Sequence, residues 1–123
     1  MPNALPLAAP DPAAASAVLT KATLRAAHLL GLTNAATARV IGVSAATMSR
    51  LASGERVLEP GSKSAELAAL LVRLYRSLDA LVGNSEQHRR AWMTSHNRAF
   101  NQPPRKAIES AEGLALVVRY LDG

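Results

Sequence analysis

The segment Asn34–Gly54, NAATARVIGVSAATMSRLASG, predicts two short helices that cross at a tight turn. Ala38 stands where the first helix must approach the second closely, and Gly42 stands in the turn, where a backbone with positive φ is needed. Ser44 is a suitable N-cap for the second helix, and Gly54 is a suitable stop. This register predicts a helix-turn-helix, a unit that places its second helix in the major groove of DNA.

The predicted unit divides into an inward apolar face and an outward polar face. The inward residues have the spacing that two crossed helices need: Ile41, Val43, Met48 and Leu51. The outward residues of the second helix are those we expect nearest to DNA: Ser44, Ala45, Ala46, Thr47, Ser49 and Arg50. Arg50 is suited to a guanine or a phosphate. Thr33, Asn34 and Arg56 are expected at phosphates, because helix N-termini and flanking loops meet the backbone. Arg39 faces outward and is a further candidate for a phosphate contact.

Composition favours one small basic domain, or two very small helical lobes, in 123 residues. The net charge of +5 favours a polyanionic partner, and aromatic residues at 3% argue against single-strand or RNA binding by stacking. The absence of cysteine excludes disulfides and thiolate metal sites, and it fits a cytoplasmic location. Residues 1–15 contain no Lys or Arg, so we expect no secretion signal, and no segment is long and apolar enough to span a membrane.

Periodicity along the chain predicts an all-α fold. Residues 1–15 are expected to form a flexible tail, 16–61 the helix-turn-helix region, 62–84 a long connecting and dimerisation helix, and 85–123 a C-terminal region. The apolar line predicted for the first helix consists of Val18, Ala22, Leu29 and Leu30. The long helix has a leucine stripe at steps of three and four residues: Leu67, Leu70, Leu71, Leu74, Leu78 and Leu81. An apolar arc this wide predicts more than one neighbour, one being the helix-turn-helix and another a second copy of the chain.

The C-terminal region is predicted to hold three helices, and it offers no catalytic constellation. The first helix begins at Ser85 and stops near Asn97, a short one begins at Pro104, and the last covers residues 111–121. The three histidines, His28, His88 and His96, lack the spacing of a helical metal pair. No glycine-rich phosphate loop is present. We therefore expect no enzyme, no metal and no cofactor.

The C-terminal region, from Ala91 to the end, resembles the toxin-binding domain of the MbcA/ParS/Xre antitoxin family. In that family a helix carrying Trp and then Asn precedes a proline-containing loop, a small helix ending in S/T-x-E-G, and an apolar helix. The matching residues are Trp92, Asn97, Pro104, Ile108, Glu112, Gly113, Val117, Tyr120 and Leu121. Three positions depart from the pattern: Phe100 replaces an expected Leu, and Asn101 and Gln102 stand where Gly-Lys or a similar pair is expected. Phe keeps the apolar anchor, and Asn tolerates the left-handed conformation that Gly would adopt.

The resemblance implies an antitoxin that binds a RES-domain toxin acting on NAD and keeps the NAD pocket of the toxin closed. It also implies that antitoxin and toxin together bind their own promoter, which is double-stranded DNA, and repress it. The residues expected to contact the toxin are Asn97, Arg98, Arg105, Lys106, Glu109, Arg119, Tyr120, Asp122 and Gly123.

Two questions remain open from the sequence. The first is how the chain contacts the toxin. The carboxylate of Asp122 or Gly123 is suited to the phosphate-binding part of the toxin pocket, whereas Arg105, Lys106 or Arg119 is suited to acidic residues of the toxin. The second is the function of the whole chain, which is also compatible with a stand-alone helix-turn-helix repressor whose C-terminal half only dimerises.

Overall fold

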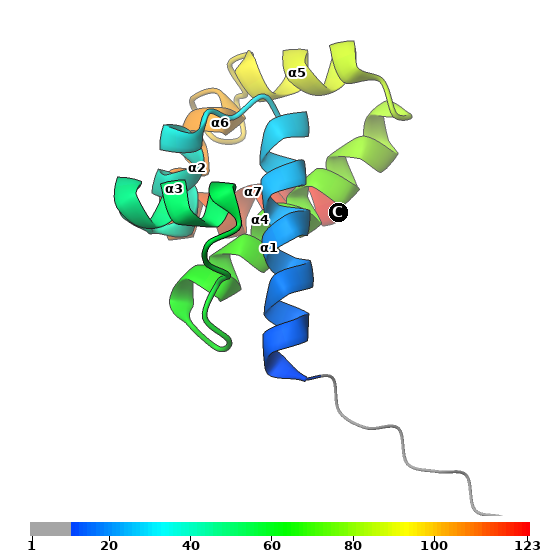
Figure 1. Ribbon diagram of the computed structural model, residues 1–123. Coiled ribbons are helices and arrows are strands. Elements are labelled where there is room, and N and C mark those ends of the chain that lie inside the picture. The colour runs from blue at the N-terminus through cyan, green and yellow to red at the C-terminus, as the bar shows by residue number, and fades with distance from the viewer. Residues whose placement is uncertain (1–10) are drawn as a thin grey trace, which may run out of the picture.

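Helix α4, Lys63–Val82, lies at the centre of the structure, and four of the other helices pack against it (Figure 1). The structure is a computed structural model that describes residues 11–123, and residues 1–10 of the predicted tail lie outside the described part. The remaining elements are α1 (Pro12–Leu29), α2 (Asn34–Ile41), α3 (Ala45–Ser53), α5 (Glu86–Thr94), α6 (Pro104–Ala107) and α7 (Ala111–Asp122). Residues 11–123 form helices and no named strand, so the prediction of an all-α fold is confirmed.

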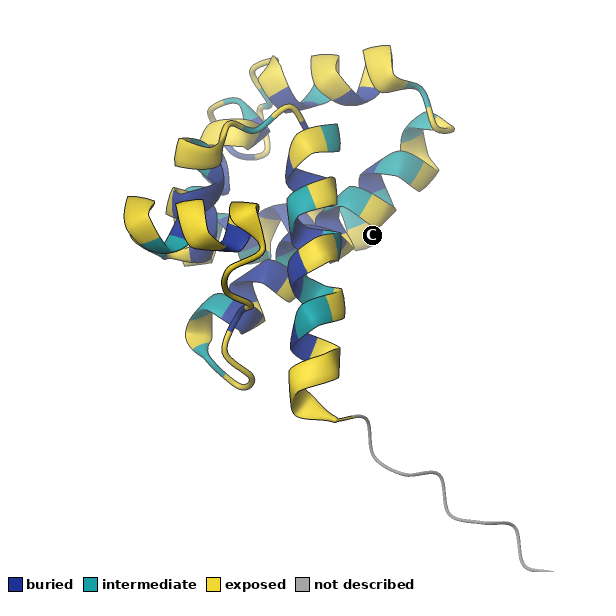
Figure 2. Ribbon diagram, viewed as in Figure 1, coloured by how far each residue is buried: buried dark blue, intermediate teal, exposed yellow. Residues whose placement is uncertain are grey.

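One core runs through both halves of the chain, and α4 supplies its centre. Leu71, Leu74 and Leu78 of α4 are completely buried, and α1, α2, α5 and α7 all contact this helix. Figure 2 shows the buried surface of these helices turned toward α4. Burial of one leucine side chain contributes about 1.5–3 kcal/mol. The prediction of a buried leucine stripe is wrong at its C-terminal end, where Leu81 is 66% exposed.

Side-chain caps start the helices where the sequence predicts them. Five caps accept a hydrogen bond from the backbone N–H three residues further on: Thr33, Ser44, Ser62, Ser85 and Ser110. Each cap satisfies a donor that the first turn of a helix leaves without a partner. The starts of α2, α3, α4, α5 and α7 are therefore fixed by local sequence.

Helix α1 departs from the prediction at its start and in its buried face. It begins at Pro12, with Asp11 as N-cap, so residues 12–15 are helical and not part of a tail. Val18, predicted to be inward, is 69% exposed, whereas Thr20 and Thr23 are buried. The buried threonine hydroxyls donate to backbone carbonyls one turn earlier, at 2.6 and 2.7 Å. With its hydroxyl satisfied in this way, a threonine packs as a small branched apolar residue.

The loop between α5 and α6 is shaped by its asparagines. Helix α5 ends at Thr94, three residues before the predicted end. The Asn97 N–H donates to the Gln102 carbonyl at 3.2 Å, and its side-chain oxygen accepts from the Ala99 N–H at 2.9 Å. Asn101 has φ of 56°, so the expected left-handed conformation is confirmed.

Gly113 allows α7 to begin directly beside α6. A Cβ atom added to Gly113 would overlap the backbone carbonyl oxygen of Ala107. Its N–H binds the hydroxyl of the N-cap Ser110 at 3.0 Å. The glycine of the S-x-E-G pattern is therefore required by a close backbone approach, and its φ is ordinary.

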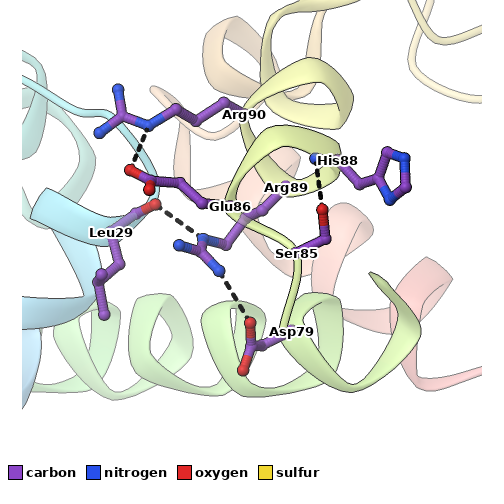
Figure 3. Close-up of polar contacts among 7 residues, drawn as sticks. All are labelled: Leu29, Asp79, Ser85, Glu86, His88, Arg89 and Arg90. Carbon is purple, nitrogen blue, oxygen red and sulfur yellow. Dashed lines mark hydrogen bonds and ion pairs between the residues drawn. The ribbon is translucent and has the colours of Figure 1, made fainter. Parts of the chain in front are cut away.

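Arg89 joins three helices at the end of the bundle where α5 crosses α1 and α4 (Figure 3). Its Nε donates to the Leu29 carbonyl at 2.8 Å, and its Nη1 donates to Asp79 Oδ1 at 2.9 Å. The guanidinium also lies 5.6 Å from the centre of the Tyr75 ring. Only 5% of this side chain is exposed, so the pair is held away from solvent. The neighbouring Arg90 points outward and pairs with Glu86.

We predict that Arg89→Gln lowers the free energy of unfolding by about 3 kcal/mol, because it leaves Asp79 and a backbone carbonyl without their partner. Urea denaturation followed by circular dichroism measures this change. Arg90→Gln is the matched control, and its effect should stay within about 0.5 kcal/mol because its ion pair is solvent-exposed. Equal effects of the two substitutions would contradict a stabilising role for the buried contacts of Arg89.

We predict that Gly113→Ala destabilises the protein by about 2 kcal/mol, because α6 and α7 must separate to accommodate the methyl group. Helix propensity alone predicts the opposite sign, a gain of about 1 kcal/mol for Gly to Ala in a helix. The sign of the change in urea midpoint therefore decides between the two effects.

Candidate functional site

Helices α2 and α3 form the predicted helix-turn-helix. Helix α2 ends at Gly42, whose φ of 73° and ψ of 39° give the left-handed turn that the sequence predicts. Ala38 is buried, as expected for the small residue at a close helix contact. Met48 and Leu51 pack α3 against the core. The unit therefore has the small contact residue, the glycine turn and the capped second helix in the predicted order.

Helix α3 presents its polar face to solvent. Ala45, Ala46, Ser49 and Arg50 are exposed, whereas Thr47 is half-buried. The Ser44 hydroxyl donates to Thr47 Oγ1 at 3.1 Å, so both hydroxyls also serve the N-terminal cap of α3. Beside this face, a shallow hollow of about 420 Å³ separates α2 from α3. Its lining is mostly small side chains: Asn34, Ala35, Ala38, Ala45, Met48, Ser49, Ala52 and Ser53.

The flanking residues predicted at phosphates fall into two groups. Thr33, Asn34 and Arg56 are exposed at the start of α2 and after α3. Arg39 instead binds Glu109, with its Nε 2.9 Å from Oε1. The Arg39 side chain is thereby directed toward the C-terminal region, while 54% of it remains exposed, and its phosphate contact stays a prediction.

Three aromatic side chains from three parts of the C-terminal region form a cluster that the sequence analysis did not predict. Trp92 of α5, Phe100 of the loop and Tyr120 of α7 have ring centres 5.1–6.5 Å apart. Phe100 is buried, as expected for an apolar anchor, Trp92 is half-buried, and Tyr120 is 52% exposed. A hollow of about 360 Å³ adjoins Trp92 and is lined by parts of α4, α5 and the following loop. Trp and Tyr in such positions are typical of protein–protein contact sites.

Some of the residues predicted to contact the toxin already have hydrogen-bond or ion-pair partners within the chain. Asn97 shapes its own loop, and Glu109 is held by Arg39. Asp122 accepts from the Ser77 hydroxyl at 2.9 Å and pairs with Arg73 of α4. Within residues 11–123, no carboxylate lies within ion-pair distance of the exposed cations of this region: Arg98, Arg105, Lys106 and Arg119. Gly123 is exposed at the end of α7.

Two features escaped the sequence analysis for different reasons. The Trp92, Phe100 and Tyr120 contacts join residues up to 28 positions apart, and no periodicity records such a contact. Their rarity is the available signal, because the sequence contains only one Trp, one Phe and two Tyr. Arg89 gave no signal at all, since Arg89 and Arg90 look equivalent until packing buries one of them. Trp92 and Leu121, two apolar residues of the family pattern, are only half-buried.

The described residues give no geometric indication of a metal or membrane site. Across residues 11–123, no three His, Cys, Asp or Glu side chains gather as metal ligands would. None of the helices formed by these residues has the length and apolar character needed to cross a bilayer.

Comparison with known families assigns both parts of the chain. Residues 4–73 match the antitoxin Xre-like helix-turn-helix domain, and residues 77–123 match the antitoxin Xre/MbcA/ParS C-terminal toxin-binding domain. A comparison with curated proteins gives no match. The matched domains are non-enzymatic regulatory domains, in agreement with the expectation that the chain is not an enzyme. The chain therefore belongs to the Xre/MbcA/ParS family and is the antitoxin of a toxin–antitoxin system.

Proposed function

We propose that this antitoxin binds and inhibits a RES-domain toxin that consumes NAD, and that it represses its own operon by binding promoter DNA as a dimer or as a toxin complex. The observation that carries the proposal is the presence of two separate exposed surfaces on one core. One is the polar face of α3, and the other is the aromatic cluster with its neighbouring cations. Because its target is a promoter, we place the antitoxin in the cytoplasm.

The DNA surface in this proposal consists of α3 and the residues that flank the unit. Arg50 reads a guanine or binds a phosphate, and the small residues Ala45, Ala46 and Ser49 allow close approach of α3 to the groove. Ser44 and Thr47 lie at the start of α3, where hydroxyl and backbone donors meet a phosphate. Thr33, Asn34 and Arg56 bind the backbone of the duplex. With one long cation on α3, specificity comes mainly from a paired half-site, which is the reason for proposing a dimer.

The toxin surface in this proposal is centred on Tyr120, beside Trp92 and Phe100. Arg98 and Arg119 are exposed on the segments that carry Phe100 and Tyr120, and we assign both cations to this surface. The Asp122 carboxylate faces Arg73 and Ser77 of α4 and is already neutralised. Of the two modes open from the sequence, the geometry favours arginine contacts to acidic groups of the toxin over insertion of Asp122 into a phosphate pocket.

Co-expression with the product of the neighbouring gene, followed by size-exclusion chromatography with light scattering, tests the proposal. We expect a stable complex that contains both proteins and binds the DNA upstream of the operon. A homodimer that binds this DNA but recovers no partner would support the stand-alone repressor instead. Cellular NAD measured with and without the antitoxin identifies the class of toxin, since loss of NAD only without the antitoxin is expected.

We predict that Arg50→Ala weakens binding to the promoter duplex at least about fivefold, the lower end of the effect of one base contact. Binding to the toxin should be unchanged, because α3 is not part of the toxin surface. Fluorescence anisotropy with a labelled duplex measures the affinity for DNA, and calorimetry measures the affinity for the toxin. Arg25→Ala is the matched control, since Arg25 is exposed on α1 and is not assigned to either surface.

We predict that Arg119→Glu weakens the toxin complex at least about tenfold, because it places like charges opposite each other. Asp122→Asn should leave the affinity unchanged, because this carboxylate is turned toward α4. Calorimetric titration of the toxin with each variant gives both affinities. The reverse result, with Asp122→Asn weak and Arg119→Glu unaffected, would establish carboxylate insertion.

A further inference from the structure

The helix-turn-helix of this chain carries little excess positive charge for binding DNA. Between residues 33 and 62 the cations are Arg39, Arg50 and Arg56, and the acids are Glu55 and Glu59. Arg39 is committed to Glu109. The two remaining arginines are matched in number by two acids. Affinity for a duplex rises with the number of phosphates that Lys and Arg neutralise, so a unit with so little excess charge gains affinity from cations on neighbouring elements.

The fold supplies such cations on α6. Figure 1 shows α6 next to α2, and the ion pair between Arg39 of α2 and Glu109 confirms that the two segments are neighbours. Glu109 follows α6 directly, and its N–H donates to the Lys106 carbonyl at 3.1 Å. Arg105 and Lys106 are exposed, and neither has a carboxylate partner within residues 11–123. The nearest acid in sequence, Glu109, is already neutralised by Arg39.

Helix α6 is also held rigidly in place. Pro104, Ala107 and Ile108 are buried, and Gly113 lets α7 contact the backbone of α6 closely. The backbone that carries the two adjacent cations is therefore held in place by packing on both sides of them.

The position of α6 suits the sugar–phosphate backbone that meets the start of α2. Helix α2 has eight residues, so it is about 12 Å long, and Arg39 lies within that distance of Thr33 and Asn34. A strand of duplex DNA adds a phosphate about every 3.4 Å along the axis. In the proposed docking, the strand that contacts Asn34 runs along α2 toward α6 and passes about three phosphates within the length of this helix.

We infer that Arg105 and Lys106 bind the phosphate backbone of double-stranded DNA and extend the helix-turn-helix surface onto the C-terminal region. This inference rests on the proposed DNA binding, and it removes these two residues from the toxin surface that the sequence predicts. The contact is independent of base sequence, since lysine and arginine bind phosphates through charge.

The salt dependence of DNA binding by Arg105→Gln/Lys106→Gln in the full chain tests the inference. Loss of two phosphate contacts lowers the slope of log K against log salt by about 1.8. The fall in affinity between 50 and 200 mM salt should then be about twelvefold smaller than for the unmodified protein. The same change is expected for the promoter duplex and for a scrambled duplex of equal length, and toxin affinity should be unchanged.

The double variant Arg98→Gln/Arg119→Gln is the matched control, because it removes the same charge from exposed positions assigned to the toxin surface. It should keep the salt slope of the unmodified protein. Equal slopes for the two double variants would overturn the inference, and so would loss of toxin binding by Arg105→Gln/Lys106→Gln with normal DNA binding. If the unmodified protein binds neither duplex, the proposed DNA binding itself fails, which is a distinct result. Unchanged thermal midpoints establish that all variants are folded.

Discussion

The apolar surface of α4 is the constraint on which the rest of the structure depends. Its leucines are buried by α1 and α2 on the side of the helix-turn-helix domain and by α5 and α7 on the side of the C-terminal domain. One helix therefore completes two family domains, and neither half has a separate core. Since packed interiors resist deformation, the α3 face and the aromatic cluster keep a fixed relation to each other.

Ion pairs between the two halves redistribute charge over the surface. Arg39 neutralises Glu109 and Arg73 neutralises Asp122, so cations of the N-terminal half cancel acids of the C-terminal half. The helix-turn-helix therefore has fewer unpaired cations than its sequence contains, and the C-terminal region has fewer unpaired acids. Exposed pairs of this kind contribute little to stability. Their main effect is on the surface potential, because the cations that they leave unpaired are the ones most available to a polyanion or to an acidic protein surface.

Local chemistry accounts for the parts of the fold that sequence predicts well. Ser44 starts α3 and Gly42 ends α2 through contacts within a few residues, so these boundaries need no knowledge of the rest of the chain. The leucine stripe of α4 likewise identified a helix buried on several sides. On α1 the prediction was wrong at Val18, which is exposed, and it missed Thr20, whose buried hydroxyl donates to the Ser16 carbonyl and accepts from the Leu58 N–H, 38 residues away.

The sequence by itself determined the helices, their caps, the helix-turn-helix and, through residues such as Trp92 and Gly113, the resemblance to an antitoxin family. Each of these depends on spacing within a short segment. Tertiary structure alone decided that Arg89 is buried while Arg90 is exposed, and that Glu109 and Asp122 are already paired. These outcomes depend on which distant elements meet, and a linear pattern of residue types does not contain that information.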